Sequence, residues 1–233
     1  MFMYALQALV LLLRFNTANV RPAQTSSLEL KSLLDVSDFM QEYYLHPQPE
    51  RIGKLIEAMH RTGLLQKYGS LPPTIGFFSE IFTANPGRLP QWQVLIAKQD
   101  GQTKAALDEA LSVSKAGGVL NLDGHSGELN DEYWGAFFAS GNPKFVYRLV
   151  DQLRYFDERN DEALFLAGGT AKWSLASNAQ TKPAVRSAIQ DVRAKTDKRT
   201  QELISELLAV DPASVKQEIS EIIKKQRETG KWK

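Results

Sequence analysis

One stretch, Asp131–Leu153, constrains the fold of this chain most strongly; it reads DEYWGAFFASGNPKFVYRLVDQL. Its first half carries residues spaced three and four apart, which places them on one helical face: Trp134, Phe137, Phe138 and Gly141. Gly141 can adopt the left-handed conformation that ends a helix, and Asn142 followed by Pro143 can begin the next one. The stretch therefore predicts two helices joined by a tight turn, antiparallel and with their apolar faces together.

The two helices of this stretch carry separate start and packing signals. Asn130 is predicted to cap the first helix, ahead of Asp131 and Glu132, whose charges would meet the positive end of the helix dipole. The second helix is predicted to bury one stripe of apolar residues: Val146, Leu149, Val150 and Leu153.

Weaker copies of the pattern recur along the chain. Aromatic residues, a turn and an apolar stripe surround Pro49, Pro86, Pro143 and Pro183. Any protein built from helix–turn–helix units shows such turns. Here the position of the proline and the spacing of the apolar residues after it recur together, which favours a true repeat. The predicted fold class is all-α: stacked antiparallel helical hairpins, as an irregular α-solenoid or helical bundle, with an N-terminal hydrophobic segment.

The composition is that of an ordinary globular protein. Of 233 residues, 43% are hydrophobic and 24% charged, and the formal net charge is +1. Such a balance gives no indication of a nucleic-acid ligand. The absence of cysteine excludes disulfides, and it is compatible with an exported bacterial protein.

The N-terminal run Met1–Leu13 reads MFMYALQALVLLL and is too short to span a bilayer, which needs about 20 residues. Its length matches the core of a secretory signal peptide, although no Lys or Arg precedes it. Residues 1–23 are therefore predicted to be a signal peptide or a membrane anchor, with a first helix packed on the core as the alternative. A cleaved segment predicts a periplasmic or secreted protein, and a retained one a membrane-anchored or cytoplasmic protein that meets the membrane only through this segment.

The remaining chain divides into two predicted parts. Residues 27–195 form the helical-hairpin domain, interrupted by a glycine-rich loop at 115–130, where a domain boundary is the less favoured alternative. Residues 196–233 form amphipathic helices that either cap the stack or pair with another chain. The last residues, KKQRETGKWK, are expected to fray.

No pattern in the sequence predicts a catalytic, cofactor or metal site. The three histidines lack the spacing of metal ligands on a helix face. The stretch Ala167–Lys172 resembles a phosphate-binding loop only superficially, because its surroundings are helical. Gly168 and Gly169 are instead predicted to mark a close helix contact or a kink. Glu80 lies among phenylalanines, and its pKa would rise if it faced the core.

Aromatic helix ends are the residues with the most binding character. Adjacent residues on a helix point about 100° apart, so one of each pair can fill the core while the other lines a groove. The predicted partner-binding residues are Tyr43, Tyr44, Phe78, Trp134 and Phe137. The alternative is that these rings fill the space between the hairpins.

The hairpin stack resembles tetratricopeptide and Sel1 proteins in architecture, although its repeats are not 34 residues long. The phrases WGAFFASGNPKFV and KWSLASNAQTKPAV resemble those of uncharacterised bacterial helical proteins with export-like N-termini, which implies bacterial origin. The predicted function is a non-enzymatic binding or scaffold protein of the bacterial envelope with a protein or peptide partner. The alternative is a helical enzyme or small-ligand-binding protein, with its site near Glu80, Trp134 and the glycine loop.

Overall fold

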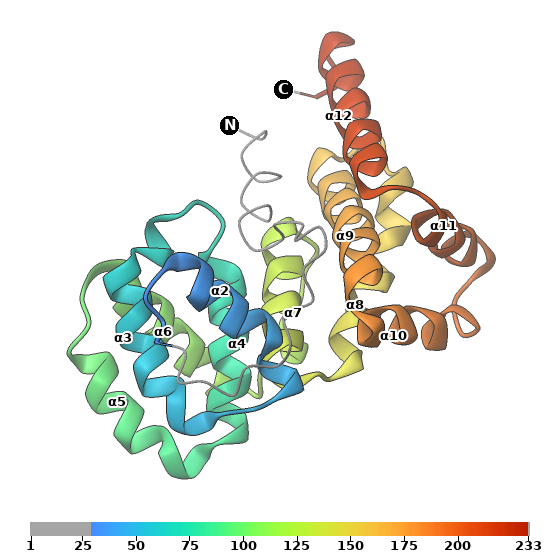
Figure 1. Ribbon diagram of the computed structural model, residues 1–233. Helices are drawn as coiled ribbons and strands as arrows, with labels where there is room; N and C mark the ends of the chain where they lie inside the picture. Colours follow the sequence, from blue (N-terminus) through green and yellow to red (C-terminus); the bar gives the residue numbers. More distant parts are fainter. Residues whose placement is uncertain (1–28, 233) are drawn as a thin grey trace. The chain divides into compact units, whose positions relative to one another are not determined.

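The computed structural model describes residues 29–232, so the predictions for residues 1–23 lie outside the described part of the chain. Every regular element of residues 29–232 is helical, which confirms the all-α fold class (Figure 1). The α-helices are α2 (Leu33–Glu42), α3 (Ile52–Thr62), α4 (Leu71–Ala84), α5 (Leu89–Ala97), α6 (Gly101–Lys115), α7 (Gly127–Ser140), α8 (Pro143–Gln152), α9 (Glu162–Thr181), α10 (Pro183–Arg193), α11 (Lys198–Ala209) and α12 (Pro212–Glu228).

These helices form two compact units. Unit 1 contains the described residues up to Asn121 together with Gly135–Gly141, and unit 2 contains Leu122–Trp134 and the chain from Asn142 onward. The boundary passes through α7, so α7 contributes residues to both units, whereas α8 lies in unit 2. Their antiparallel packing stays a prediction.

Unit 1 is built around α4, a helix buried on every side from Pro73 to Ser79. The aromatic rings of α4 and of two neighbouring helical segments contact one another in a row, with successive centroids 5.4–5.9 Å apart. The order of the rings is Tyr43, Phe77, Phe78, Phe82 and Trp92. Such edge and tilted contacts are the arrangements that aromatic pairs prefer. A continuous row of aromatic rings therefore runs through the core of unit 1, among many buried aliphatic side chains.

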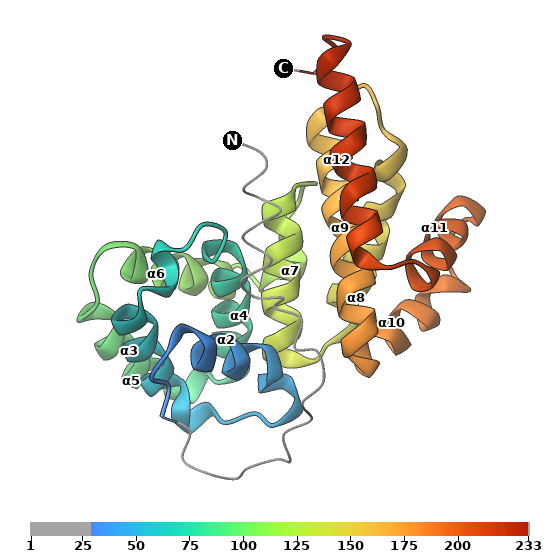
Figure 2. The same ribbon diagram turned by 45° about the horizontal axis from the view of Figure 1, so that its top comes forward.

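Unit 2 is built around α9, which packs against α8, α10, α11 and α12 (Figure 2). Small residues allow these helices to approach closely: a Cβ at Gly168 would lie 2.3 Å from the backbone N of Phe156, and one at Gly169 would lie 3.4 Å from Ile219 Cδ1. The predicted close contact at this glycine pair is confirmed, and α9 continues through it as one helix.

Several predicted helix boundaries are confirmed. Gly141 has a φ of 66° and ends α7, and the Asn142 side chain accepts a hydrogen bond from the Lys144 backbone N–H at the start of α8. The predicted stripe of α8 is buried. Each of the four recurring prolines lies in the first turn of a helical segment: Pro49, Pro86, Pro143 and Pro183.

The predicted cap at Asn130 is wrong, because α7 already begins at Gly127. The Ser126 hydroxyl accepts a hydrogen bond from the Leu129 N–H and caps the helix one turn earlier. Asn130 lies inside the helix and is buried, and its amide donates to the Ala167 carbonyl and the Thr170 hydroxyl. The predicted loop 115–130 is correspondingly shorter at its C-terminal end.

The expectation of a frayed C-terminus is also wrong, because Trp232 anchors it. The Trp232 indole is buried, its ring centroid lies 5.0 Å from that of Phe165, and its N–H donates to the Arg159 carbonyl at 3.2 Å. Arg227 adds an ion pair to Glu162 at 2.8 Å. Trp232, which follows the last helix, is thus part of the core of unit 2.

We expect Trp232→Ala to lower the free energy of unfolding by about 3 kcal/mol, because the change removes a buried indole and a hydrogen bond. Urea unfolding followed by circular dichroism measures the change. Lys231→Ala, at the exposed neighbouring position, is the control and should leave stability unaltered. Equal stability of the two variants would show that the terminus is not anchored.

Candidate functional site

The predicted partner-binding aromatic residues are mostly inside the protein. Tyr43, Phe78, Trp134 and Phe137 are each at most 4% exposed, so their rings offer no surface to a partner. Their burial favours the alternative, in which the rings fill the interior. The physical reason is clearest for Phe78: α4 is buried all round, so neither of two adjacent phenylalanines can reach a groove.

Tyr44 is the one predicted binding residue that keeps some exposure. Its ring lies 5.1 Å from that of Phe137 and rests against Gly141, where an added Cβ would meet it at 3.3 Å. Partial burial raises the pKa of the Tyr44 hydroxyl. A single half-covered ring does not make a binding groove.

Five large apolar side chains of the described part of unit 1 are exposed: Leu34, Leu45, Tyr68, Leu71 and, on α5, Val94. One side of this helix is buried through Trp92 and Ile96, while the opposite side exposes Pro90, Val94 and Ala97. These three residues are spaced four and three apart, so they share one helical face. Val94 is 58% exposed, among the highest values for a large apolar residue in the described chain. We call Pro90, Gln91, Gln93, Val94 and Ala97 the α5 surface.

The α5 surface belongs to a segment that is almost free of charge. Ten of the fifteen residues of Thr83–Ala97 are exposed, yet Arg88 is the only charged one. In the chain as a whole 24% of residues are charged. Depletion of charge is typical of the centre of protein–protein interfaces and atypical of ordinary solvent-exposed helices. Its low content of charged residues therefore distinguishes this exposed segment from the average of the chain.

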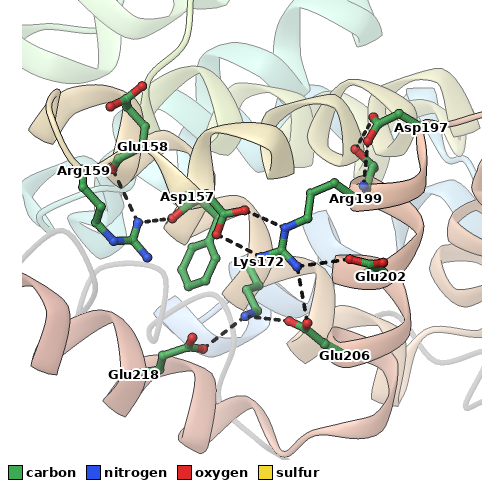
Figure 3. Close-up of polar contacts among 11 residues, drawn as sticks. Asp157, Glu158, Arg159, Lys172, Asp197, Arg199, Glu202, Glu206 and Glu218 are labelled. Atoms are coloured by element: carbon green, nitrogen blue, oxygen red, sulfur yellow. Dashed lines mark hydrogen bonds and ion pairs between the residues drawn. The ribbon is translucent and has the colours of Figure 1, made fainter.

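A second cluster, of charged residues, lies inside unit 2 around Lys172 (Figure 3). Lys172 is only 3% exposed, and its ammonium group lies 3.1 Å from Glu218 and 3.4 Å from Glu206. The same group lies 4.0 Å from the centroid of the Phe156 ring, a cation–π contact. One lysine of α9 thus joins α11, α12 and the turn Leu153–Asp157.

Arg199 extends this cluster toward solvent. Its guanidinium donates to both carboxylate oxygens of Asp157, at 2.6 and 2.9 Å, and lies 3.7 Å from Glu206. The hydrogen bond from Arg199 lowers the pKa of the Asp157 carboxyl. Every charged side chain in the cluster lies beside one of opposite charge. The ion pairs therefore connect α9, α11, α12 and the turn Leu153–Asp157 to one another.

Burial raises the pKa of the carboxyl groups of Glu80 and Asp131. Glu80 faces the turn Val119–Asn121, whose first backbone N–H partly opposes the effect of desolvation on the Glu80 pKa. Burial raises the pKa of Asp131 well above its usual value, and the nearby Glu128 and Glu132 add to the effect. Glu80 and Asp131 lie in different units.

His125 lies in the segment that the sequence predicts to be a loop. Its Nδ1 lies 3.1 Å from the Gln152 amide oxygen and its Nε2 lies 2.9 Å from the Tyr155 hydroxyl. The Gln152 amide oxygen can only accept, so Nδ1 donates in the first contact, whereas the Tyr155 hydroxyl can donate or accept in the second. The three side chains tie the loop to the C-terminal end of α8.

Lys172 and the α5 surface are the features that the sequence prediction missed. The signal for Lys172 was its isolation: beyond Glu162 it is the only charged residue of the twenty-residue helix α9. The signal for α5 was its lack of charged residues. A fully buried helix lacks charged residues as well, so this signal alone could not show that one side of α5 is exposed.

No family model, curated protein or solved structure matches this chain. Within residues 29–232, no three His, Asp or Glu side chains come together as metal ligands. No helix of the same residues has the length and apolar character needed to cross a bilayer.

Proposed function

We propose that this chain is a binding or scaffold protein that presents the α5 surface to the apolar side of a protein or peptide partner. The observation that carries the proposal is the exposed, uncharged face of α5, formed around Val94. A partner helix with apolar residues at matching three- and four-residue spacing would bury this face without desolvating a charge. Location in the bacterial envelope belongs to the same proposal and depends on Met1–Leu13.

The rigid setting of α5 supports this role. Trp92 and Ile96 fix the helix to the core, and Leu95 lies against α3, where a Cβ at Gly53 would meet its Cδ1 at 3.0 Å. A surface held in place before binding loses less entropy when it is covered. The proposed contact residues therefore project from a preorganised element rather than from a loop.

Selection from a displayed random-peptide library against the immobilised full chain tests this function. We expect enriched peptides to be apolar along one side and to bind Val94→Glu at least about tenfold more weakly, because the new carboxylate would have to be desolvated. Val210→Glu is the matched control, since Val210 is an exposed valine of unit 2 at 37% exposure. Peptides that bind the two variants equally well would overturn the proposal.

A further inference from the structure

The hydroxyl of Tyr155 has a base beside it, in unit 2 and therefore outside the unit that carries the α5 surface. The Nε2 atom of His125 lies 2.9 Å from this hydroxyl, and the two ring centroids are 4.5 Å apart. The hydrogen bond is exposed to solvent, although Tyr155 as a whole is half-buried. A hydroxyl within hydrogen-bond distance of an imidazole is the arrangement by which proteins activate a weak nucleophile.

Gln152 determines which nitrogen of the imidazole faces the hydroxyl. Its amide oxygen lies 3.1 Å from His125 Nδ1 and can only accept, so Nδ1 carries a proton. In the neutral ring Nε2 then holds the free lone pair, and the Tyr155 hydroxyl donates to it. Gln152 is only 3% exposed, so the surrounding side chains hold its amide in place. Gln152 is therefore a positioning residue, and His125 is the proton acceptor.

The local fold holds these three side chains from two directions. Gln152 ends α8, and Tyr155 follows three residues later in the helical turn Leu153–Asp157, so both lie on the same side of the chain and reach one ring. His125 directly precedes Ser126, whose hydroxyl caps α7. The contacts are therefore set by two helix ends, which position side chains more precisely than a loop does.

A positive charge lies over the same phenol ring. The guanidinium carbon of Arg154 is 5.1 Å from the centroid of the Tyr155 ring. A cation at this position attracts the negative charge that develops on a phenol as it loses its proton. Tyr68 offers a contrast, because it is 61% exposed but its hydroxyl has no hydrogen-bond partner among residues 29–232. Exposure alone favours reaction at Tyr68, whereas the neighbouring groups favour Tyr155.

The charges around Tyr155 favour an uncharged group over a phosphoryl group. Burial raises the pKa of the Asp151 carboxyl, and the nearby Arg154 opposes this shift. Arg154 thus shares its charge with Asp151, and the site lacks the surplus of positive charge that binds a phosphoryl donor. Transfer of an acyl group has no such requirement.

From this geometry we infer that Tyr155 is a site of covalent acylation, which accepts the acyl group of an activated ester. The phenol oxygen forms a bond to the acyl carbon, and the bond from that carbon to the ester oxygen breaks. His125 Nε2 takes the phenol proton, and the leaving group departs with the electron pair of the broken bond. The product is an aryl ester at Tyr155. A positioned general base accelerates such a step by about 10²–10⁴.

Acetylation of the full chain by p-nitrophenyl acetate tests the inference. The reagent is applied at neutral pH, and peptide mass spectrometry measures the acetyl group on each tyrosine. Removal of the group by hydroxylamine shows that it is an ester. We expect Tyr155 to be acetylated at least about tenfold faster than Tyr68, in spite of its lower exposure. Equal or slower acetylation of Tyr155 would overturn the inference.

Substitutions of His125 and Gln152 distinguish a base from a contact that only holds the loop. His125→Gln keeps an amide oxygen that can accept from the Tyr155 hydroxyl, but an amide does not take up the proton. We expect acetylation of Tyr155 to fall about tenfold, with acetylation of Tyr68 and the circular dichroism spectrum as in the natural chain. An unaltered rate at Tyr155 would overturn the role of His125.

The positioning role of Gln152 has its own pair of variants. Gln152→Met removes the acceptor for Nδ1 at similar volume and should lower the rate at Tyr155 about threefold relative to Tyr68. Gln152→Glu keeps an acceptor oxygen and should retain the rate. Equal rates for the two variants would contradict this role.

Tyr155→Phe identifies the atom that receives the acyl group. We expect the variant to release p-nitrophenolate more slowly than the natural chain, by the amount of ester that forms at Tyr155. Release equal to that of the natural chain would make the His125 imidazole the acceptor and would overturn the assignment to Tyr155. Peptide binding at the α5 surface depends on Val94 in unit 1, so neither result bears on the proposed function.

Discussion

Replacing Gly168 by alanine is expected to lower the free energy of unfolding by about 3 kcal/mol, at the upper end of what overpacking usually costs. The new Cβ would lie 2.3 Å from the Phe156 backbone N and 2.5 Å from the Tyr155 carbonyl carbon. Both are backbone atoms, so no rotation of a side chain can relieve the clash. The turn Leu153–Asp157 would have to move away from α9, and Lys172 would lose its contact with the Phe156 ring.

The adjacent glycine supplies a matched control. A Cβ at Gly169 would first meet Ile219 Cδ1, at 3.4 Å, which is an ordinary contact with the end of a flexible side chain. Gly169→Ala should therefore be neutral or stabilising, by up to about 1 kcal/mol, because alanine favours the helix. Urea unfolding of both variants distinguishes the two sides of α9. Similar stabilities would mean that the close approach at Gly168 is not required.

The sequence predicts those parts of the fold that depend on local chemistry. Gly141 and Asn142–Pro143 end one helix and begin the next because the left-handed glycine and the Asx cap act within a few residues. The contact at Gly168 was also predictable, since a glycine pair inside a helix pattern needs a packing reason. Each of these signals lies within a few residues of sequence, so it can be recognised without knowing which helices pack together in the fold.

The features that escaped prediction depend on tertiary neighbours. Trp232 follows a run of charged residues, and only the presence of Phe165 and the Arg159 carbonyl makes its burial favourable. Phe78 was predicted at a surface because adjacent residues diverge on a helix, but α4 is enclosed on all sides. For Val94 the sequence shows an apolar helix without showing which side remains uncovered.

Substitutions of Lys172 should separate packing from ion pairing in the cluster of unit 2. Lys172→Ala is expected to lower the free energy of unfolding by about 2–4 kcal/mol, because it empties the space that the buried lysine stem occupies. Lys172→Met fills nearly the same space without the charge. We expect its stability to lie within about 1 kcal/mol of the natural chain, since a well-packed apolar residue often replaces a buried ion pair without loss.

The exposure of the two acidic partners explains this difference. The side chains of Glu206 and Glu218 are 48% and 46% exposed, so water can solvate their carboxylates once the ammonium group is gone. Only the lysine is fully enclosed. Lys172→Glu should therefore be the least stable of the three variants. We expect its free energy of unfolding to be about 3–5 kcal/mol below that of the natural chain, because it buries an unpaired charge beside two others of the same sign.

Urea unfolding of the three variants at one pH and salt concentration gives the ranking. A methionine variant as unstable as the alanine variant would contradict the packing explanation, because the two differ mainly in the volume that they fill. In that case the ion pairs of Lys172 would hold α11 and α12 on α9. If the predicted order is found, the shape of the lysine stem stabilises unit 2, and the ion pairs mainly define which faces of α11 and α12 meet the central helix.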